Sequence, residues 1–301
     1  MAAGLGGGAL PGERSVRHAS FEGVQVLTIL FGLASAVGWG APDPVLATAV
    51  RRIGAFPVVF GSIVIGTVLA SPLALVLDLP DWTERSLLLA PLVGILTVVG
   101  FQAGFTSFRD GAVSVVAPII ACEGGVAALF SIAGGEHLNG LVLLGLPFAV
   151  AGVVLVSRGE GEGGRGGVVP AVAAALIWGG VLALSAPIAH DLGAGWAFLL
   201  VRGSAVVVML PVALAVGAVR PVRSEWWRVA IWGICDAVAY FAFVLAADHG
   251  PAAVAGVLAA QFGTVGAVVA VVFFGEHLRR RQVVGIAIVA VAVGAMAVGG
   301  G

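Results

Sequence analysis

The tetrapeptide GEHL at residues 135–138 recurs as GEHL at residues 275–278, a spacing of 140 residues. Each copy follows one long apolar stretch and precedes another. A second motif, the dipeptide WG at residues 39–40, recurs at residues 178–179 inside an apolar stretch. Two motifs that repeat at nearly the same spacing indicate that one unit of about 140 residues is present twice.

The composition is that of a protein embedded in lipid. Hydrophobic residues make up 60% of the chain and charged residues 10%, whereas a soluble domain usually carries about 25% charged residues. The mean hydropathy is +1.11. The net charge is −1 and no basic stripe is present, so the sequence predicts no nucleic-acid partner. We therefore expect an all-α integral membrane protein whose surroundings are the lipid bilayer.

The apolar stretches have the length of membrane-spanning helices. A helix rises about 1.5 Å per residue, so about 20 apolar residues cross a hydrocarbon core of about 30 Å. Counting such stretches predicts ten transmembrane helices. They are expected at 23–42, 55–78, 86–107, 112–133, 139–157, 168–189, 195–217, 227–247, 251–274 and 282–299. The sequence APDP at residues 41–44 is expected to break or kink the first of them, because prolines remove backbone donors.

The repeat divides the predicted helices into two sets of five. The sequence GEGEGGRGG at residues 159–167 is flexible by composition and separates the sets. We expect a disordered tail over 1–22, a first five-helix repeat over 23–158 and a second over 168–301. Because each repeat crosses the membrane an odd number of times, the second copy enters from the opposite side. Such inverted repeats are common in secondary transporters.

The arginines bear on the orientation in the membrane. Ten crossings put both termini on one side, where only Arg14, Arg17 and Arg85 are found. The loops expected on the opposite side hold Arg51, Arg52, Arg109, Arg158, Arg165, Arg220, Arg223, Arg228, Arg279, Arg280 and Arg281. By the positive-inside rule, this distribution places both termini outside.

The motifs resemble those of a known family. The chain is similar, from about residue 23 to residue 299, to ten-span transporters of the EamA type in the drug/metabolite transporter superfamily. The similarity rests on WG in the first helix of each half and on GE between the fourth and fifth helices of each half. Gly145 and Gly285, early in the helices that follow, are also typical. Where similar proteins often carry a proline, this chain has Glu123 and Gly263.

The resemblance implies that the chain moves a small metabolite across a membrane by alternating access. Substrates across the family include amino acids, nucleotide-related compounds, sugars and drugs, and coupling to protons is often proposed. The resemblance also implies that both termini face the cytoplasm, against the arginine distribution. Both orientations therefore stay open, as does the direction of transport.

Two carboxyl groups in the middle of predicted helices are the first candidates for a site. A charge near the bilayer centre costs at least about 2.5 kcal/mol. Glu123 lies mid-way along the fourth predicted helix and Asp236 mid-way along the eighth. We predict that both bind substrate and carry protons, with a proton exchanged for a cationic or amine-bearing compound. The alternatives are a protonated Glu123 that only packs between helices, and an internal ion pair of Asp236 with Arg202.

Other polar residues at membrane depth extend this set. Arg202 either binds a substrate carboxylate with both prongs of its guanidinium group or reaches to the membrane interface. Tyr240 follows Asp236 by four residues, so the two side chains share one face of the predicted helix. Gln102 and Gln261 either contact the ligand or form hydrogen bonds between helices.

The two tryptophans of the WG motifs complete the candidate set. They either form aromatic walls of a cavity or serve as packing and interfacial anchors. The predicted substrate-binding residues are Trp39, Gln102, Glu123, Trp178, Arg202, Asp236, Tyr240 and Gln261. Glu136 and Glu276 of the GEHL motifs lie at helix ends, where we expect them to cap the next helix.

Transport is favoured over two other functions. A membrane-embedded enzyme needs a nucleophile or metal cluster at one depth, and the predicted helices hold no HExxH motif or Ser/His/Asp set. A channel is the remaining alternative. The chain has no lysine and no phosphate-binding loop, so its energy source is a gradient. The sequence predicts a non-enzymatic monomer without cofactor or metal, whose partners are a small-molecule substrate, the bilayer and protons.

Overall fold

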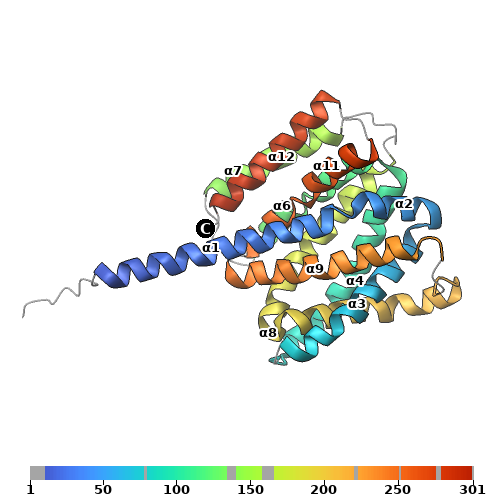
Figure 1. Ribbon diagram of the computed structural model, residues 1–301, viewed down its shortest axis with the longest axis horizontal. Helices are drawn as coiled ribbons and strands as arrows, with labels where there is room; N and C mark the ends of the chain where they lie inside the picture. The colour runs from blue at the N-terminus through green and yellow to red at the C-terminus, as the bar shows by residue number, and fades with distance from the viewer. Residues whose placement is uncertain are drawn as a thin grey trace, which may run out of the picture.

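The protein is a bundle of helices. The computed structural model describes residues 11–77, 80–133, 140–157, 166–219, 223–250, 252–275 and 279–299. These ranges contain helices and connecting segments and no strand (Figure 1). The helices are α1 (Pro11–Gly40), α2 (Asp43–Ile53), α3 (Ala55–Leu77), α4 (Glu84–Asp110), α5 (Val113–Ile120), α6 (Glu123–Ala133), α7 (Gly140–Ser157), α8 (Val168–Ala215), α9 (Trp226–His249), α10 (Ala252–Ala259), α11 (Phe262–Phe274) and α12 (Arg280–Gly299).

The outside of the bundle is apolar, as the composition predicts. Large hydrophobic side chains such as Leu88, Val169, Phe273 and Val291 are more than two-thirds exposed. In water such a surface would aggregate, whereas in a bilayer it meets hydrocarbon. Within the described ranges, seven helical segments are long and apolar enough to cross a membrane. The protein is therefore an all-α, multi-pass membrane protein.

Several helices begin or break at positions that differ from the sequence-based expectation. The helix α1 begins at Pro11, so residues 11–22 are helical and that part of the expected tail is wrong. Proline suits a helix start because the first amides of a helix have no intrahelical partner. The helix α8 runs through both predicted segments 168–189 and 195–217 and bends at Gly193, where φ is 76° and ψ is 163°. Residues 1–10, most of the linker 159–167, the first GEHL motif and residues 276–278 of the second lie outside the described residues.

Three apolar segments are broken within their length. The expected break at residues 41–44 is confirmed, because α1 ends at Gly40 and α2 begins at Asp43. The fourth predicted helix divides into α5 and α6 at Ala121 and Cys122. The ninth divides into α10 and α11 at the equivalent position, between Ala259 and Phe262. The sequence analysis did not predict the second and third breaks.

The two equivalent broken helices cross each other at their breaks. A Cβ on Gly124 of α6 would lie 3.0 Å from the Gly256 carbonyl oxygen of α10. A Cβ on Gly263 of α11 would lie 2.6 Å from the Ala117 carbonyl oxygen of α5. Both glycines therefore allow backbones to approach more closely than any side chain permits. The repeat thus produces reciprocal contacts, in which each half packs its second segment on the other half's first.

The glycines of the WG motifs follow the same reciprocal pattern. A Cβ on Gly40 of α1 would collide with the Phe262 carbonyl oxygen at the start of α11. A Cβ on Gly179 of α8 would collide with Val126 of α6. The WG glycine of the first half therefore packs on the broken helix of the second half. The WG glycine of the second half packs on the broken helix of the first. This close approach explains why tryptophan is followed by glycine in both copies.

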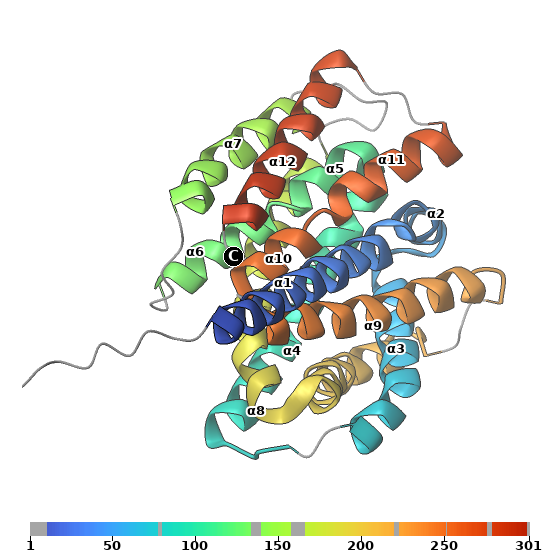
Figure 2. The ribbon, with the colours of Figure 1, turned by 60° about the vertical axis from the view of Figure 1, so that its left-hand side comes forward.

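The two halves interleave. The helix α1 packs along α9, α4 along α8, and α7 along α12, each pair joining a first-half helix to a second-half helix (Figure 2). The buried core follows these contacts, with Phe101 and Phe105 from α4, Leu182 and Phe198 from α8, and Phe243 from α9. A space enclosed by this core is therefore lined by both copies of the repeat.

We expect Gly179→Ala to destabilise the protein by about 1–3 kcal/mol, because the added methyl group overpacks the α8–α6 crossing. Gly203→Ala on the same helix is the matched control, since a Cβ there meets nothing within 4 Å. That change should be neutral or slightly stabilising, as alanine favours helix more than glycine. Thermal unfolding in detergent measures both, and equal melting temperatures for the two variants would contradict the reciprocal-crossing argument.

Candidate functional site

A cavity lies beside the crossing of the broken helices. It offers about 50 Å³ to water-sized molecules, enough for roughly three to five waters. Both halves of the chain contribute to its wall. The lining residues are Trp39, Asp43, Phe101, Gly104, Phe105, Phe108, Ile120, Glu123, Trp178, Trp232 and Phe262. The site is thus a small aromatic chamber that holds two carboxyl groups, Asp43 and Glu123.

The aromatic wall of the chamber is packed edge to face. The ring of Phe101 lies 4.6 Å from Trp178 and 5.1 Å from Trp232, centroid to centroid. Phe105 lies 4.9 Å from Trp232 at an interplanar angle of 88°. Each such pair contributes about 0.5–1.5 kcal/mol beyond the burial of its area. These contacts fix the ring orientations, so the chamber has a defined shape before any ligand enters.

An ion pair lies directly behind this wall. Arg202 Nη2 of α8 donates a hydrogen bond to Asp236 Oδ1 of α9 at 2.9 Å. Trp39 Nε1 of α1 donates to the same oxygen at 3.0 Å. Arg202 and Asp236 are each only 1% exposed. The three residues link three helices and hold the Trp39 indole in place against the chamber.

The Arg202 guanidinium group is surrounded by aromatic rings. Its central carbon lies 4.8 Å from the ring centroid of Phe101, 5.5 Å from Phe198 and 5.8 Å from Tyr240. Such contacts favour a buried cation by about 0.5–2 kcal/mol each. The internal ion pair with Asp236 named in the sequence analysis is therefore present, and Arg202 does not extend to the membrane interface.

The structure divides the predicted residues into groups. Trp39, Glu123 and Trp178 line the chamber. Arg202, Asp236 and Tyr240 lie in the cluster behind it, with Tyr240 and Asp236 both facing Arg202 from α9. The remaining two residues lie outside both groups.

The two glutamines are separate from the chamber lining. Gln261 immediately precedes α11 without capping it through its side chain, and its side-chain oxygen accepts a hydrogen bond from Thr264 Oγ1 at 3.2 Å. The side-chain oxygen of Gln102 is buried without a hydrogen-bond partner among the described residues. Contact with a ligand stays a prediction for Gln102 and for Gln261.

Sequence reasoning missed the second carboxyl group of the chamber. Asp43 is 3% exposed and is the first residue of α2. It lies in the APDP segment, which reads as a turn at the end of a transmembrane helix. The sequence feature that could have indicated Asp43 is an acidic residue beside a proline, a combination typical of the first turn of a new helix. Trp232 and Phe101 were also missed, since both resemble ordinary core residues in the sequence.

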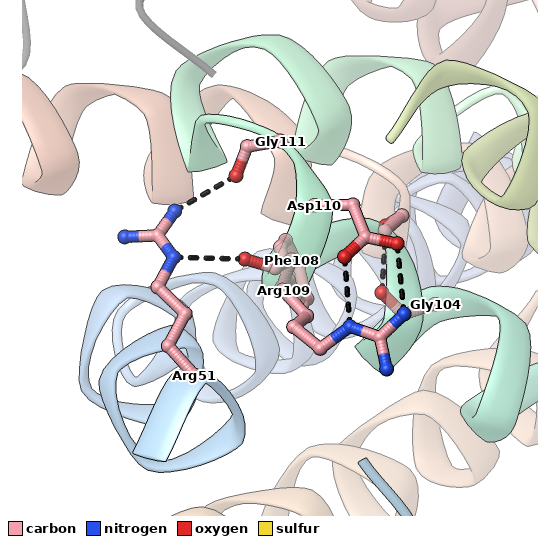
Figure 3. Close-up of polar contacts among 7 residues, drawn as sticks. Arg51, Gly104, Phe108, Arg109, Asp110 and Gly111 are labelled. Carbon is pink, nitrogen blue, oxygen red and sulfur yellow. Dashed lines mark hydrogen bonds and ion pairs between the residues drawn. The ribbon is translucent and has the colours of Figure 1, made fainter. Parts of the chain in front are cut away.

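Arg51, at the end of α2, is bonded to the end of α4 near the chamber. Arg51 Nε donates to the Phe108 carbonyl oxygen at 3.2 Å and its Nη2 donates to the Gly111 carbonyl oxygen at 2.8 Å (Figure 3). These bonds hold the end of α4 against α2. Because Phe108 also lines the chamber, the same contacts fix the part of the wall that Phe108 forms. Beside them, Arg109 and Asp110 form an exposed ion pair at 2.7 Å (Figure 3).

A second arginine contact joins the two halves of the chain at this end. Arg52 Nη1 donates to Glu225 Oε1 at 3.0 Å, and Arg228 Nη1 donates to Glu225 Oε2 at 2.7 Å. Burial alone would raise the pKa of the Glu225 carboxyl, but the hydrogen bonds from Arg52 and Arg228 hold that pKa below its usual value. Glu225 is therefore ionised at neutral pH and pairs with both arginines.

The other end of the bundle is held by hydroxyl groups. Thr83 Oγ1 and Ser86 Oγ at the start of α4 both donate to Asp191 Oδ2 of α8, at 2.9 Å and 2.5 Å. Thr83 also caps α4 by accepting a hydrogen bond from the Ser86 amide. The chamber therefore lies between two polar contacts, one near each end of the helices that surround it.

Comparison with known proteins decides the family. The model of the EamA-like transporter family matches residues 26–158 and again residues 165–298, one match for each copy of the repeat. The chain belongs to the EamA-like transporter family. It is therefore a multi-pass membrane transporter whose family moves small substrates, and the resemblance seen in the short motifs is confirmed.

Solved structures support the same fold. This EamA-like transporter matches one described as "Crystal structure of protein" with a TM-score of 0.64 and 18% sequence identity. The match covers 90% of this chain and 97% of the other. At that identity the likeness shows the fold alone. No curated protein matches the chain.

The ion pair behind the chamber sets the expectation for Asp236→Asn. Removing one partner of a buried pair costs about 3–5 kcal/mol because the other charge stays buried. We expect a large loss of thermal stability in detergent for Asp236→Asn and partial recovery when Arg202→Met is added. Asp110→Asn, which breaks an exposed pair, is the control and should cost about 1 kcal/mol or less. Equal losses for Asp236→Asn and Asp110→Asn would show that the buried pair has no structural role.

Proposed function

We propose that this EamA-like transporter is a secondary transporter that moves a small metabolite, an amine, an amino acid or a drug-like compound, by alternating access. It works in the plasma (inner) membrane as a monomer with ten crossings, arranged as two inverted five-helix repeats. Its direction is export, coupled to the entry of protons. The chamber between the two halves is the substrate site.

One observation carries this proposal. The chamber lies where the broken helices of the two halves cross, and its wall comes from both. In transporters built from inverted repeats, substrates bind near the middle of the membrane at the interface of the repeats, beside interrupted helices. The polar contacts near the two ends of the bundle, at Glu225 and at Asp191, are suited to opening in turn.

Glu123 is the proposed proton carrier. It lines the chamber, is 4% exposed and begins α6 at the break of that helix pair. A carboxyl group in this position binds a proton when the chamber is open to one side of the membrane. It binds a positively charged substrate when the chamber is open to the other side. Asp236 is the second proton-coupling residue, and it takes up a proton only in a state in which Arg202 has moved away from it.

The inverted arrangement predicts the sides on which two labels appear. In a chain with Cys122→Ala and Cys235→Ala, we introduce Ala3→Cys in one variant and Gly161→Cys in another. Five crossings separate these positions, so a membrane-impermeant maleimide applied to intact cells should label one variant only. Labelling of both from the same side would mean an even number of crossings in the first half, and the inverted repeat would then be wrong.

Glu123→Gln tests the coupling. In proteoliposomes with an imposed pH gradient, the wild type should accumulate substrate and Glu123→Gln should lose gradient-driven flux by at least about tenfold, as expected for loss of an essential acid–base group. Exchange of labelled for unlabelled substrate should weaken as well, because the same carboxyl group binds the substrate, and should be measurable only at a raised substrate concentration. Asp110→Asn is the control, because its carboxyl group is exposed and remote from the chamber. Unchanged pH-driven flux in Glu123→Gln would remove Glu123 from the mechanism.

A further inference from the structure

The buried charges of the described residues do not balance at the chamber. Five charged side chains are buried in this part of the protein, namely Asp43, Glu123, Arg202, Glu225 and Asp236. Arg202 and Asp236 neutralise each other, and Glu225 is paired with Arg52 and Arg228. That leaves Asp43 and Glu123, which are both acidic and line the same chamber.

One oxygen of the Asp43 carboxyl group lacks a hydrogen-bond partner within the described structure. This oxygen, Oδ2, is buried and accepts no hydrogen bond from the described residues. The indole of Trp232 lies beside this carboxyl group, but its N–H makes no hydrogen bond of ordinary geometry. A Cβ on Gly266 of α11 would lie 3.2 Å from Oδ2, so the carboxylate occupies the gap that this glycine leaves. A buried oxygen of this kind is costly unless a donor reaches it.

Both carboxyl groups lie at the first residue of a helix, where the helix dipole offsets part of the cost that burial adds to their ionisation. Asp43 is the first residue of α2 and Glu123 is the first residue of α6. The N-terminus of a helix carries about half a positive charge, which stabilises an acidic side chain there. Two such partial charges offset only part of two full negative charges. A cationic group between the two carboxylates would supply the remainder.

The rest of the chamber wall fits the same kind of ligand. Trp39, Phe101, Trp178 and Trp232 present aromatic rings to the chamber, and aromatic faces attract ammonium groups. The ion pair behind the wall adds no net charge, so it does not oppose a cation. The volume of about 50 Å³ is room for a few waters, so it excludes a drug-sized molecule, and a quaternary ammonium group enters only when the chamber widens.

We propose that Asp43 and Glu123 together form a binding site for a compact organic cation, a protonated amine or a quaternary ammonium group, enclosed by the aromatic side chains of the chamber. This inference rests on the proposed function, because it names the substrate class of the same chamber. Asp43 is the residue that distinguishes it from a site built on Glu123 alone. The cation bridges the first-half carboxylates and the second-half indoles, so its binding also joins the two repeats.

Choline is the ligand used to test the cation site. Its neutral isostere, in which carbon replaces the ammonium nitrogen, is the control ligand of the same shape. Both are titrated into the purified full chain, and binding is followed by calorimetry and tryptophan fluorescence. The isostere should bind at least about tenfold more weakly than choline, because it keeps the shape and loses the charge. Equal affinities for choline and the isostere would overturn the cation site.

Variants assign the site to its residues. Asp43→Asn and Glu123→Gln should each weaken choline binding by about tenfold or more, and Asp110→Asn should leave it unchanged. Full binding in Asp43→Asn would overturn the two-carboxyl site even if Glu123→Gln fails to bind. Asp43→Glu, which keeps the charge, should bind more tightly than Asp43→Asn.

A measurement on the unchanged protein covers the case in which Asp43→Asn does not fold. A hydrophobic carbodiimide modifies carboxyl groups within membranes, and mass spectrometry locates the adducts. Choline should protect both Asp43 and Glu123 from modification, and equal labelling of Asp43 with and without choline would contradict the proposal. Choline binding without flux of any compound would defeat the transport function alone. Flux of a neutral compound with no cation binding would defeat the cation site alone.

Discussion

A charge inside a lipid-embedded bundle must be neutralised by the bundle itself, and this constraint organises the structure. Near one end of α9, Glu225 is held by arginines from α2 and α9. Deeper in, Asp236 joins Arg202 of α8 and Trp39 of α1, so that one carboxylate fixes three helices. Each contact has a structural task because an unpaired partner would be costly in a medium without water. The chamber carboxyls stand apart, since no basic side chain of the described structure pairs with them.

The second constraint is the close approach of backbones. Without a hydrophobic driving force between helices in lipid, association depends on packing, and small residues let helices come together. Here the glycines act in pairs related by the repeat. Gly40 and Gly179 bring α1 and α8 onto α11 and α6, while Gly124 and Gly263 bring the two broken helices onto each other. Carbonyl groups freed at the breaks are buried in protein rather than facing lipid, the condition under which broken helices are tolerated in membranes.

The sequence predicted the features that depend on local pattern. The apolar stretches indicated the membrane helices, and the repeated WG and GEHL motifs indicated the duplication that the family match bears out. The breaks within α5–α6 and α10–α11 escaped prediction because they arise from tertiary crossings, while their sequences read as continuous apolar helix. Asp43 escaped for a related reason. Its depth is decided by α2, which continues the span of α1 to Ile53, whereas the sequence places Asp43 at the end of a span. Glu123, in mid-helix, was visible at once because its depth follows from position alone.

The duplication supplies the frame of the chamber, and divergence between the copies supplies its chemistry. At the repeat spacing of 140, Glu123 corresponds to Gly263, and at the spacing of 139 between the WG motifs, Asp43 corresponds to Leu182. The acidic pair therefore belongs to the first half alone, and the Arg202–Asp236 pair belongs to the second half alone. Had both copies kept the carboxyls, four acidic groups would meet at the crossing of the broken helices, where their mutual repulsion and desolvation would oppose packing. With both carboxyls on the first half and Trp178, Trp232 and Phe262 on the second, the chamber has a single negative side, and a cation held there contacts both repeats at once.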